Sequence, residues 1–504
     1  MINLKAQRAA GAGSVVLVGG IALNAVLNYG FGVTLAWLLP QDDFGAVSVL
    51  LSVLLLAATV LAAGFPWALA RTVARADGAG PAARAEADSA FRAALLGNVG
   101  LGLFLAAVLI VVQLTTGKIL PGASVALTLT MAGSVVLISL YSVLWGAVHG
   151  VRCFDAIGLT QLAETLLKVA GGLVLVGLCG FGVGGVATAV LASIVVAVWL
   201  SCRALGDRLP RPGPVASARA FATAAPMAVG TIGFGLLTTL DILVLSALGH
   251  DHGLGFATVA VYQAAAVLAR APVLLSSALA EAMFPFIARE RTKAEAHRWF
   301  QTGFRWVPLA FVPAQLVLLI TPGSVLGLLF PASYDQAAEL ARVITIGTTG
   351  LIVADMLLKA LLARGLAGAI AVRIPVSVAV QLVALFVLVP RFGALGAATS
   401  FAAGSWAAAG LLASVYVGQY WPGWLRMRTV VGWGGAVGVL ALVLATATLV
   451  ARPLDLLVIL VGLGVYAALA VRLRLVPEAD VAAVRTRLMR LGGQRTPAQG
   501  QHRD

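Results

Sequence analysis

Long apolar runs, separated by short polar or glycine-rich loops, recur along the whole chain. A bilayer-crossing α-helix needs about 20 mostly apolar residues, and most of these runs reach or exceed that length. They predict fourteen membrane spans, at residues 14–38, 44–70, 93–114, 123–147, 157–178, 182–201, 221–248, 256–288, 306–330, 337–362, 369–389, 393–417, 430–450 and 455–472. We therefore expect an all-α, multi-pass membrane protein.

Composition and charge support this topology. The 504 residues are 61% hydrophobic and only 11% charged, whereas soluble domains are about 25% charged. Of the 34 Lys and Arg residues, 26 fall in loops and tails that the spans place on one side, and 3 fall on the other. The positive-inside rule puts the basic side, with both termini, in the cytoplasm. The net charge of +14 is thereby explained without a nucleic-acid partner.

Two short motifs recur at nearly the same interval. Phe44–Val49 resembles Phe256–Val261, 212 residues later, and Phe181–Thr188 matches Phe392–Thr399 at five of eight positions, 211 residues later. Six predicted spans separate the copies, so both copies face the same way. This predicts two six-span bundles in a parallel pseudo-repeat, with a substrate site between them.

The repeat divides the chain into five parts. We expect an N-terminal bundle at 1–205, a cytoplasmic linker at 206–220, a C-terminal bundle at 221–418, two additional spans at 419–475 and a basic cytoplasmic tail at 476–504. Pro210–Ala218 is proline-rich and suits a hinge. Pro477–Leu491 fits either an amphipathic helix on the inner membrane surface or a solvated tail.

No catalytic motif stands out. The chain has no Walker loop, HExxH or GxSxG, and its three cysteines lack CxxC spacing. We expect no enzyme activity, no cofactor and no metal site.

Charges inside the spans are the informative residues, because a charge at membrane depth is costly unless it faces protein or water. Five are basic and five acidic: Lys168, Arg270, Arg342, Lys359 and Arg373, and Glu164, Asp241, Glu281, Glu339 and Asp355. Three pairs stand at helical neighbour spacing, namely Glu164/Lys168, Asp355/Lys359 and Glu339/Arg342. Such pairs either neutralise each other structurally or serve function. Lys359 and Arg373 also suit snorkelling at span ends.

Arg270 and Asp241 have no charge partner within one turn of their own spans. They lie in consecutive antiparallel spans and can meet as an ion pair. Alternatively, Arg270 contacts an anionic substrate and Asp241 binds a proton or cation. Arg270 lies in the 34-residue run Phe256–Arg289, where Pro272 is expected to bend the helix.

Asn24 and Asn28 give the first span one polar face, toward a cavity or another helix. The candidate substrate-binding residues are therefore Arg270, Lys168, Asn24 and Asn28. The candidate ion-coupling residues are Asp241, Glu164, Asp355 and Glu281.

Several ordered motifs carry a family resemblance over about residues 14–417. They are Leu38–Gly45, Tyr262–Leu268 with Pro272, Phe284-Pro285, Leu328–Phe330 with Tyr334, and Phe392–Ala398. With these the chain resembles the polysaccharide (oligosaccharide-lipid) flippases of the multidrug/oligosaccharidyl-lipid/polysaccharide exporter superfamily.

The resemblance implies two six-helix bundles in a V that opens alternately to either side of the bacterial cytoplasmic membrane. It implies a lipid-linked oligosaccharide on polyprenyl diphosphate, flipped from the inner to the outer leaflet for cell-surface polysaccharide assembly. Partners would be membrane lipids and a polysaccharide polymerase or glycosyltransferase complex. Family cavities are often cationic, whereas the in-span charges here balance, which argues against a strongly anionic glycan.

Three other functions fit parts of the sequence. An ion-coupled multidrug antiporter of the same superfamily would use Asp241, Glu164 and Asp355. A major facilitator transporter also pairs six-span halves, but its usual loop motif is absent from Arg71–Arg92 and the last two spans are unexplained. A non-transport envelope scaffold would not need charges such as Arg270 and Asp241 inside its spans.

Overall fold

The computed structural model describes residues 23–76, 80–151, 153–206, 210, 225–251, 253–304, 307–420, 427–451, 454–473 and 475. Over these residues the protein is built from helices, with no strand. All but two residues of the expected linker 206–220, and all of the tail 476–504, lie outside this part, as do residues 14–22 of the first span.

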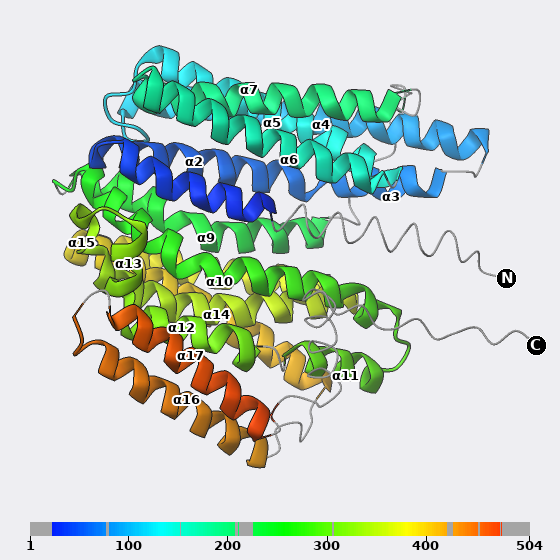
Figure 1. Cartoon of the computed structure of the whole chain (residues 1–504). Helices are drawn as coiled ribbons and strands as arrows, with labels where there is room; N and C mark the ends of the chain where they lie inside the picture. Colours follow the sequence, from blue (N-terminus) through cyan, green and yellow to red (C-terminus); the bar gives the residue numbers. More distant parts are fainter. Residues whose placement is uncertain are drawn as a thin grey trace, which may run out of the picture.

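The first bundle occupies the upper half of Figure 1. It comprises a helix at Leu23–Leu38, α2 (Gln41–Ala63), α3 (Phe65–Ala76), α4 (Pro81–Thr116), α5 (Val125–Gly150), α6 (Phe154–Leu173) with the π-helical turn η1 (Val174–Leu178), and α7 (Gly182–Leu205). The second bundle comprises α9 (Ala225–Asp251), α10 (Phe256–Arg289), α11 (Lys293–Phe304), η3 (Val307–Phe311), α12 (Val312–Ile320), α13 (Pro322–Leu329), η4 (Ala332–Tyr334), α14 (Ala337–Ala363) and α15 (Ala367–Tyr420).

The described helices can be matched to the fourteen predicted spans. The α15 segment holds two of them, because Gly393 has φ 56° and turns the chain between the predicted spans 369–389 and 393–417. Glycine suits this left-handed conformation because it carries no Cβ. Of the described helices, 11 are long and apolar enough to span a membrane. The described helix ends next to the basic loops gather at the right-hand end of Figure 1, as the topology requires.

Three details differ from the predicted spans. The prediction of one span at 306–330 was wrong, because the helix ends at Ile320 and Pro322 starts the separate helix α13. Proline has no N–H to continue the hydrogen bonds of the preceding turn. Gly64 separates α2 from α3 within the predicted span 44–70. Pro272, by contrast, does not interrupt α10, which is one helix of 34 residues.

The two bundles pack against each other along α2 and α9, where Gly235 lies against Thr59. They make further contacts at the left-hand end of Figure 1, which we call the contact end. There the two copies of the repeat motif touch: a Cβ on Gly45 would fall on the backbone oxygen of Phe256, so only glycine permits this approach. Asp42 Oδ1 accepts a 2.9 Å hydrogen bond from the Ala257 amide at the start of α10. A carboxylate there satisfies an otherwise free N–H of the helix.

The segment between α12 and α14 strengthens the contact end. Trp37 Nε1 donates to the Leu329 carbonyl and Gln41 Nε2 donates to the Ser333 carbonyl, each at 2.8 Å. Phe44 packs edge-on against the buried Tyr334, with ring centroids 5.9 Å apart. This segment has no helical counterpart between α4 and α5, so the contact end is asymmetric despite the repeat.

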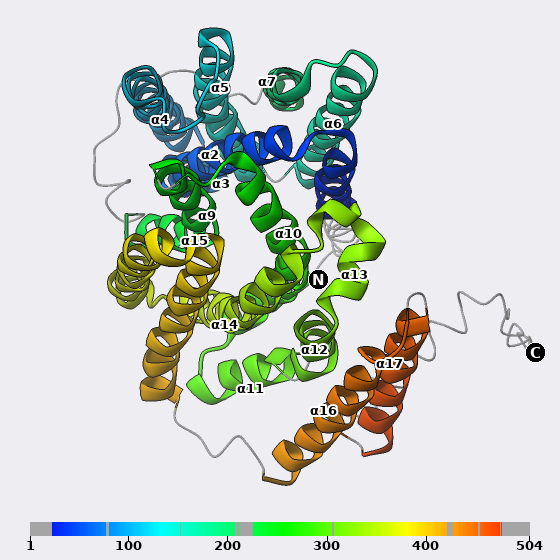
Figure 2. The same ribbon diagram turned by 90° about the vertical axis from the view of Figure 1, so that its left-hand side faces the viewer.

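The last two helices, α16 (Met427–Ala447) and α17 (Leu454–Arg472), stand beside the second bundle (Figure 2). They share an apolar cluster with α12, in which Tyr466 is buried and donates a hydrogen bond to the Pro308 carbonyl. They therefore add to the second bundle without entering the space between the bundles.

Candidate functional site

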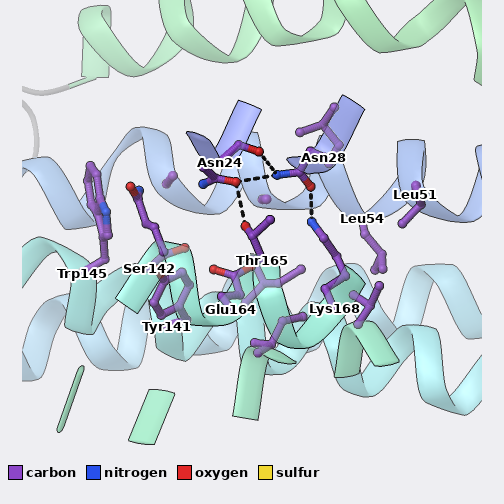
Figure 3. A pocket seen from close by; sticks show the side chains of 17 residues that line it. Asn24, Asn28, Leu51, Leu54, Tyr141, Ser142, Trp145, Glu164, Thr165 and Lys168 are labelled. Carbon is purple, nitrogen blue, oxygen red and sulfur yellow. Dashed lines mark hydrogen bonds between the residues drawn. The ribbon is translucent and has the colours of Figure 1, made fainter. Parts of the chain in front are cut away.

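A polar cavity of about 460 Å³ lies within the first bundle, among Leu23–Leu38, α2, α5, α6 and α7. It is the candidate site because its lining includes charged and amide side chains in a part of the protein that crosses the membrane (Figure 3). A second cavity of about 330 Å³, between α2 and α9, has an entirely apolar lining.

Hydrogen bonds tie the first span to α6 across this cavity. Asn28 Nδ2 donates to Asn24 Oδ1 at 2.5 Å, Thr165 Oγ1 donates to the same oxygen at 2.6 Å, and Lys168 Nζ donates to Asn28 Oδ1. The two asparagines stand one helical turn apart, as do Glu164 and Lys168, so each helix presents one polar stripe. The predicted polar face of the first span therefore lines the cavity and also bonds another helix.

Glu164 and Lys168 do not form a close ion pair. Tyr141 of α5 lies beside Glu164 in the cavity lining (Figure 3), while the hydrogen-bond partner of the Lys168 ammonium is Asn28. The ammonium has three N–H donors, and one is used within the described residues. The cavity thus holds a cation and an anion, each with capacity for a further partner.

Aromatic side chains form the other end of the cavity in Figure 3, where Trp145 and Ser142 are drawn. The Trp145 ring packs edge-on against Trp67 of α3, with centroids 5.2 Å apart, and lies 3.7 Å from the His149 ring. These contacts hold the indole in one orientation at the wall of the cavity.

Arg270 and Asp241 meet in the second bundle, outside this cavity. Asp241 is fully buried and accepts hydrogen bonds from Arg270 and Tyr262. Arg270 also donates to the Thr238 carbonyl at 2.8 Å and lies over the Phe401 ring, 4.2 Å from its centroid. The predicted ion pair therefore exists, and both terminal nitrogens of the guanidinium bond to protein, whereas Nε has no hydrogen-bond partner among the described residues.

A second charged cluster joins α10 to α14. Lys359 Nζ lies 3.1 Å from Asp355 and 3.3 Å from Glu281, and Ser277 donates to Asp355 at 2.7 Å. Asp355 is buried, whereas the Glu281 side chain is 60% exposed. Lys359 is thus paired rather than only snorkelling. Glu339 and Arg342 are exposed and show no ion pair in the described part of the chain.

The structure brings four of the predicted site residues into one cavity: Asn24, Asn28, Glu164 and Lys168. It places Arg270, Asp241, Asp355 and Glu281 elsewhere, in the second bundle. Sequence reasoning missed the remaining polar and aromatic lining, namely Tyr141, Ser142, Trp145, Gln161 and Thr165. The signal was present, because positions 161, 164, 165 and 168 form one helical stripe and Tyr141 and Trp145 are one turn apart.

Metal-ligating residues do not gather in this structure: the described residues contain no group of three or more His, Cys, Asp or Glu side chains arranged to hold an ion.

The fold is similar to that of several solved membrane transporters. An inward-facing multidrug resistance MATE family transporter of the MOP superfamily shares 16% identity and a TM-score of 0.58, covering 80% of this chain and 97% of that one. The lipid II flippase MurJ, in an inward closed conformation, shares 13% identity and a TM-score of 0.62, covering 86% and 98%. A MOP superfamily transporter from Pyrococcus furiosus shares 14% and 0.56, covering 81% and 93%.

At these identities the likeness defines the fold, and this chain is a multi-pass membrane protein with the exporter fold of the MOP superfamily. No curated protein matches its sequence. The sequence model of the polysaccharide biosynthesis protein family matches residues 10–290, more than half of the chain. The chain therefore belongs to the polysaccharide biosynthesis protein family.

Proposed function

We propose that the protein is a flippase that moves a lipid-linked oligosaccharide, a glycan on polyprenyl diphosphate, from the inner to the outer leaflet. It acts as a transporter and not as an enzyme, and it serves cell-surface polysaccharide assembly. The observation that carries this function is the polar cavity of the first bundle, with Lys168 among its lining residues.

The depth of Lys168 supports a transport role. Phe154 starts α6 at the end opposite the contact end, so Lys168 lies fourteen residues, ~21 Å, along the helix. In a hydrocarbon core about 30 Å thick this is well inside the membrane. A charge is kept at such depth where it faces a polar path, and a lipid diphosphate supplies the matching anion.

Lys168 is the better diphosphate contact of the two predicted cations. Its ammonium has one partner in the described part of the chain, whereas Arg270 is bound by Asp241, Thr238 and the Phe401 ring. Asn28 holds the amine at the cavity wall, and Asn24, which bonds Asn28, adds a second amide group for the same ligand. Arg270 would then stabilise the second bundle.

The arrangement of contacts supports alternating access. Trp37, Gln41 and Asp42 join the bundles by hydrogen bonds at the contact end, and α2 also packs against α9 further along, while the cavity extends toward the opposite end. Opening the other way requires these contacts to separate, and substrate binding shifts the balance between the two states. With both termini in the cytoplasm, the cavity faces the inner leaflet, where the lipid-linked glycan is made.

One observation favours a second function. Glu164 lines the same cavity, and a carboxylate there suits a cationic small molecule or a proton. An ion-coupled multidrug antiporter would use Glu164 in the first bundle together with Asp241, Asp355 or Glu281 in the second.

Lipid analysis separates the two functions. In bacterial cells lacking the gene, lipid-linked oligosaccharide and its sidedness are measured after restoring the wild type, Lys168→Ala or Arg270→Lys. Accumulation on the inner leaflet that the wild type and Arg270→Lys reverse, but Lys168→Ala does not, supports the flippase. Unchanged lipid-linked glycan with new sensitivity to cationic compounds supports the antiporter. Co-purification of a polymerase or glycosyltransferase with the tagged protein tests the expected partner complex.

A further inference from the structure

The function proposed above assigns no role to the aromatic end of the cavity. Trp145 lies five residues before the end of α5, ~8 Å along that helix from the end opposite the contact end. Lys168 lies ~21 Å from the same end, so the two side chains stand about 13 Å apart along the helices. The cavity is long enough to bind two different parts of one ligand at separate positions.

We propose that Trp145 forms a subsite for an uncharged sugar ring, separate from the anion site at Lys168. This subsite presupposes that a lipid-linked glycan enters the cavity, as proposed above. Sugar rings present an apolar C–H face and a rim of hydroxyl groups. An indole offers a large apolar face, and its neighbours must then supply hydrogen bonds to the rim.

The residues around Trp145 hold its apolar face in place and supply hydrogen-bonding groups for the hydroxyl rim. Trp67 and His149 pack against the ring and fix it, so little side-chain freedom is lost on binding. Ser142, Gln161 and the Asn24 amide nitrogen have no hydrogen-bond partner among the described residues, and all three side chains line the cavity. In Figure 3 the Asn24 nitrogen lies on the side of Asn24 toward Trp145 and Ser142. These are free donors and acceptors of the kind that sugar hydroxyls need.

Glu164 determines which charge on the sugar the subsite accepts. It lies between the aromatic end and Lys168 in Figure 3, and a second carboxylate beside it would be repelled in a space of low dielectric. The subsite therefore selects a neutral or N-acetylated sugar over a uronic acid. The positions of Lys168 and Trp145 orient the ligand, with its anionic group at Lys168 and its sugar toward Trp145.

The test measures lipid binding to the full-length protein in nanodiscs. Three probes are compared: polyprenyl diphosphate, the same lipid carrying N-acetylglucosamine, and the same lipid carrying glucuronic acid. For the wild type we expect the tightest binding to the N-acetylglucosamine lipid. Trp145→Ala is expected to weaken that binding about tenfold, to the level of the sugar-free lipid, and to leave the sugar-free lipid unchanged.

Matched variants control for folding. Trp199→Ala removes an exposed indole on α7 that does not line the cavity, and is expected to change no affinity. Lys168→Ala is expected to weaken all three lipids by the same factor. Trp145→Phe keeps an aromatic face and should retain most of the sugar-dependent gain. If Trp145→Ala does not fold, Gln161→Ala decides, with an expected loss of severalfold for the N-acetylglucosamine lipid only.

The outcomes are distinguishable. Wild-type protein that binds all three lipids equally, or a Trp145→Ala variant that weakens sugar-bearing and sugar-free lipids alike, overturns the sugar subsite and leaves the flippase function intact. Wild-type protein that binds none of the three lipids overturns the proposed function itself.

Discussion

The Arg270→Gln variant tests whether Arg270 stabilises the fold through its ion pair with Asp241 or binds the substrate. Asp241 is fully buried, and its hydrogen-bond donors are Arg270 and Tyr262. Without the guanidinium, a carboxylate remains in the bundle with a single neutral donor. The Thr238 carbonyl also loses its 2.8 Å bond. The substitution therefore leaves an unpaired charge in a desolvated site, in addition to removing a hydrogen bond.

The expected cost follows from this burial. Removing one partner of a buried ion pair destabilises a protein by about 3–5 kcal/mol. For a folding unit of 150–250 residues, each kcal/mol lowers the melting temperature by roughly 2–4 °C. The Arg270→Gln variant should therefore melt at least ~6 °C below the wild type. The double variant Asp241→Asn/Arg270→Gln should recover much of this loss, because neither group then carries an unpaired charge.

The assay is thermal unfolding of the purified protein in detergent, with transport measured in parallel. Arg373→Gln is the matched control, since this in-span arginine bonds only the Ala369 carbonyl one turn away, at 3.2 Å, among the described residues. It should shift melting by less than Arg270→Gln. An Arg270→Gln protein with wild-type melting but no transport would refute the structural reading and return Arg270 to the substrate path.

The contact end gives three further predictions. Gln41→Ala removes a 2.8 Å hydrogen bond between the bundles and should raise the outward-open population about 2- to 13-fold, measured by cysteine labelling from outside; no change in labelling would exclude a gating role. Asp42→Ala should cost about 0.5–2 kcal/mol of unfolding free energy through loss of the α10 amide bond, whereas Asp43→Ala, beside it, should cost less; equal losses would contradict the capping role. Gly45→Ala should lower the melting temperature because its methyl group meets backbone of the other bundle, whereas Gly100→Ala, which has open space, should not; equal effects would show that the close approach is unimportant.

The helices and their topology were accessible from sequence because a bilayer imposes a one-dimensional rule. Each span must be apolar for its whole length, and basic residues gather on one side, so both features can be counted along the chain. The fourteen spans were predicted in this way, whereas the exporter fold and the family were predicted from a resemblance carried by short ordered motifs. The boundary at Pro322 was missed because Ser324–Phe330 is as apolar as the span before it, and hydropathy does not register a break in helix direction.

The candidate site was only half accessible. Charges inside spans could be found by inspection, because they interrupt an apolar background. Which of them face a cavity could not, since a helix carries residues on all sides and the sequence does not say which side meets which neighbour. Asn24 and Lys168 are 144 residues apart, and only the packing of the first span against α6 places them in one network.

The membrane class, the number of spans, the parallel repeat and the list of charged residues that need an explanation could all be read from the amino-acid sequence. The spans and their charges follow from local composition, and the repeat follows from two motifs that recur at nearly the same interval. Tertiary structure alone decided that Arg270 is paired with Asp241, that Lys359 bridges Asp355 and Glu281, and that Lys168 keeps free donors in a cavity. The physical reason is that the energy of a buried charge depends on the groups within a few ångströms of it, and those groups come from helices far apart in the chain.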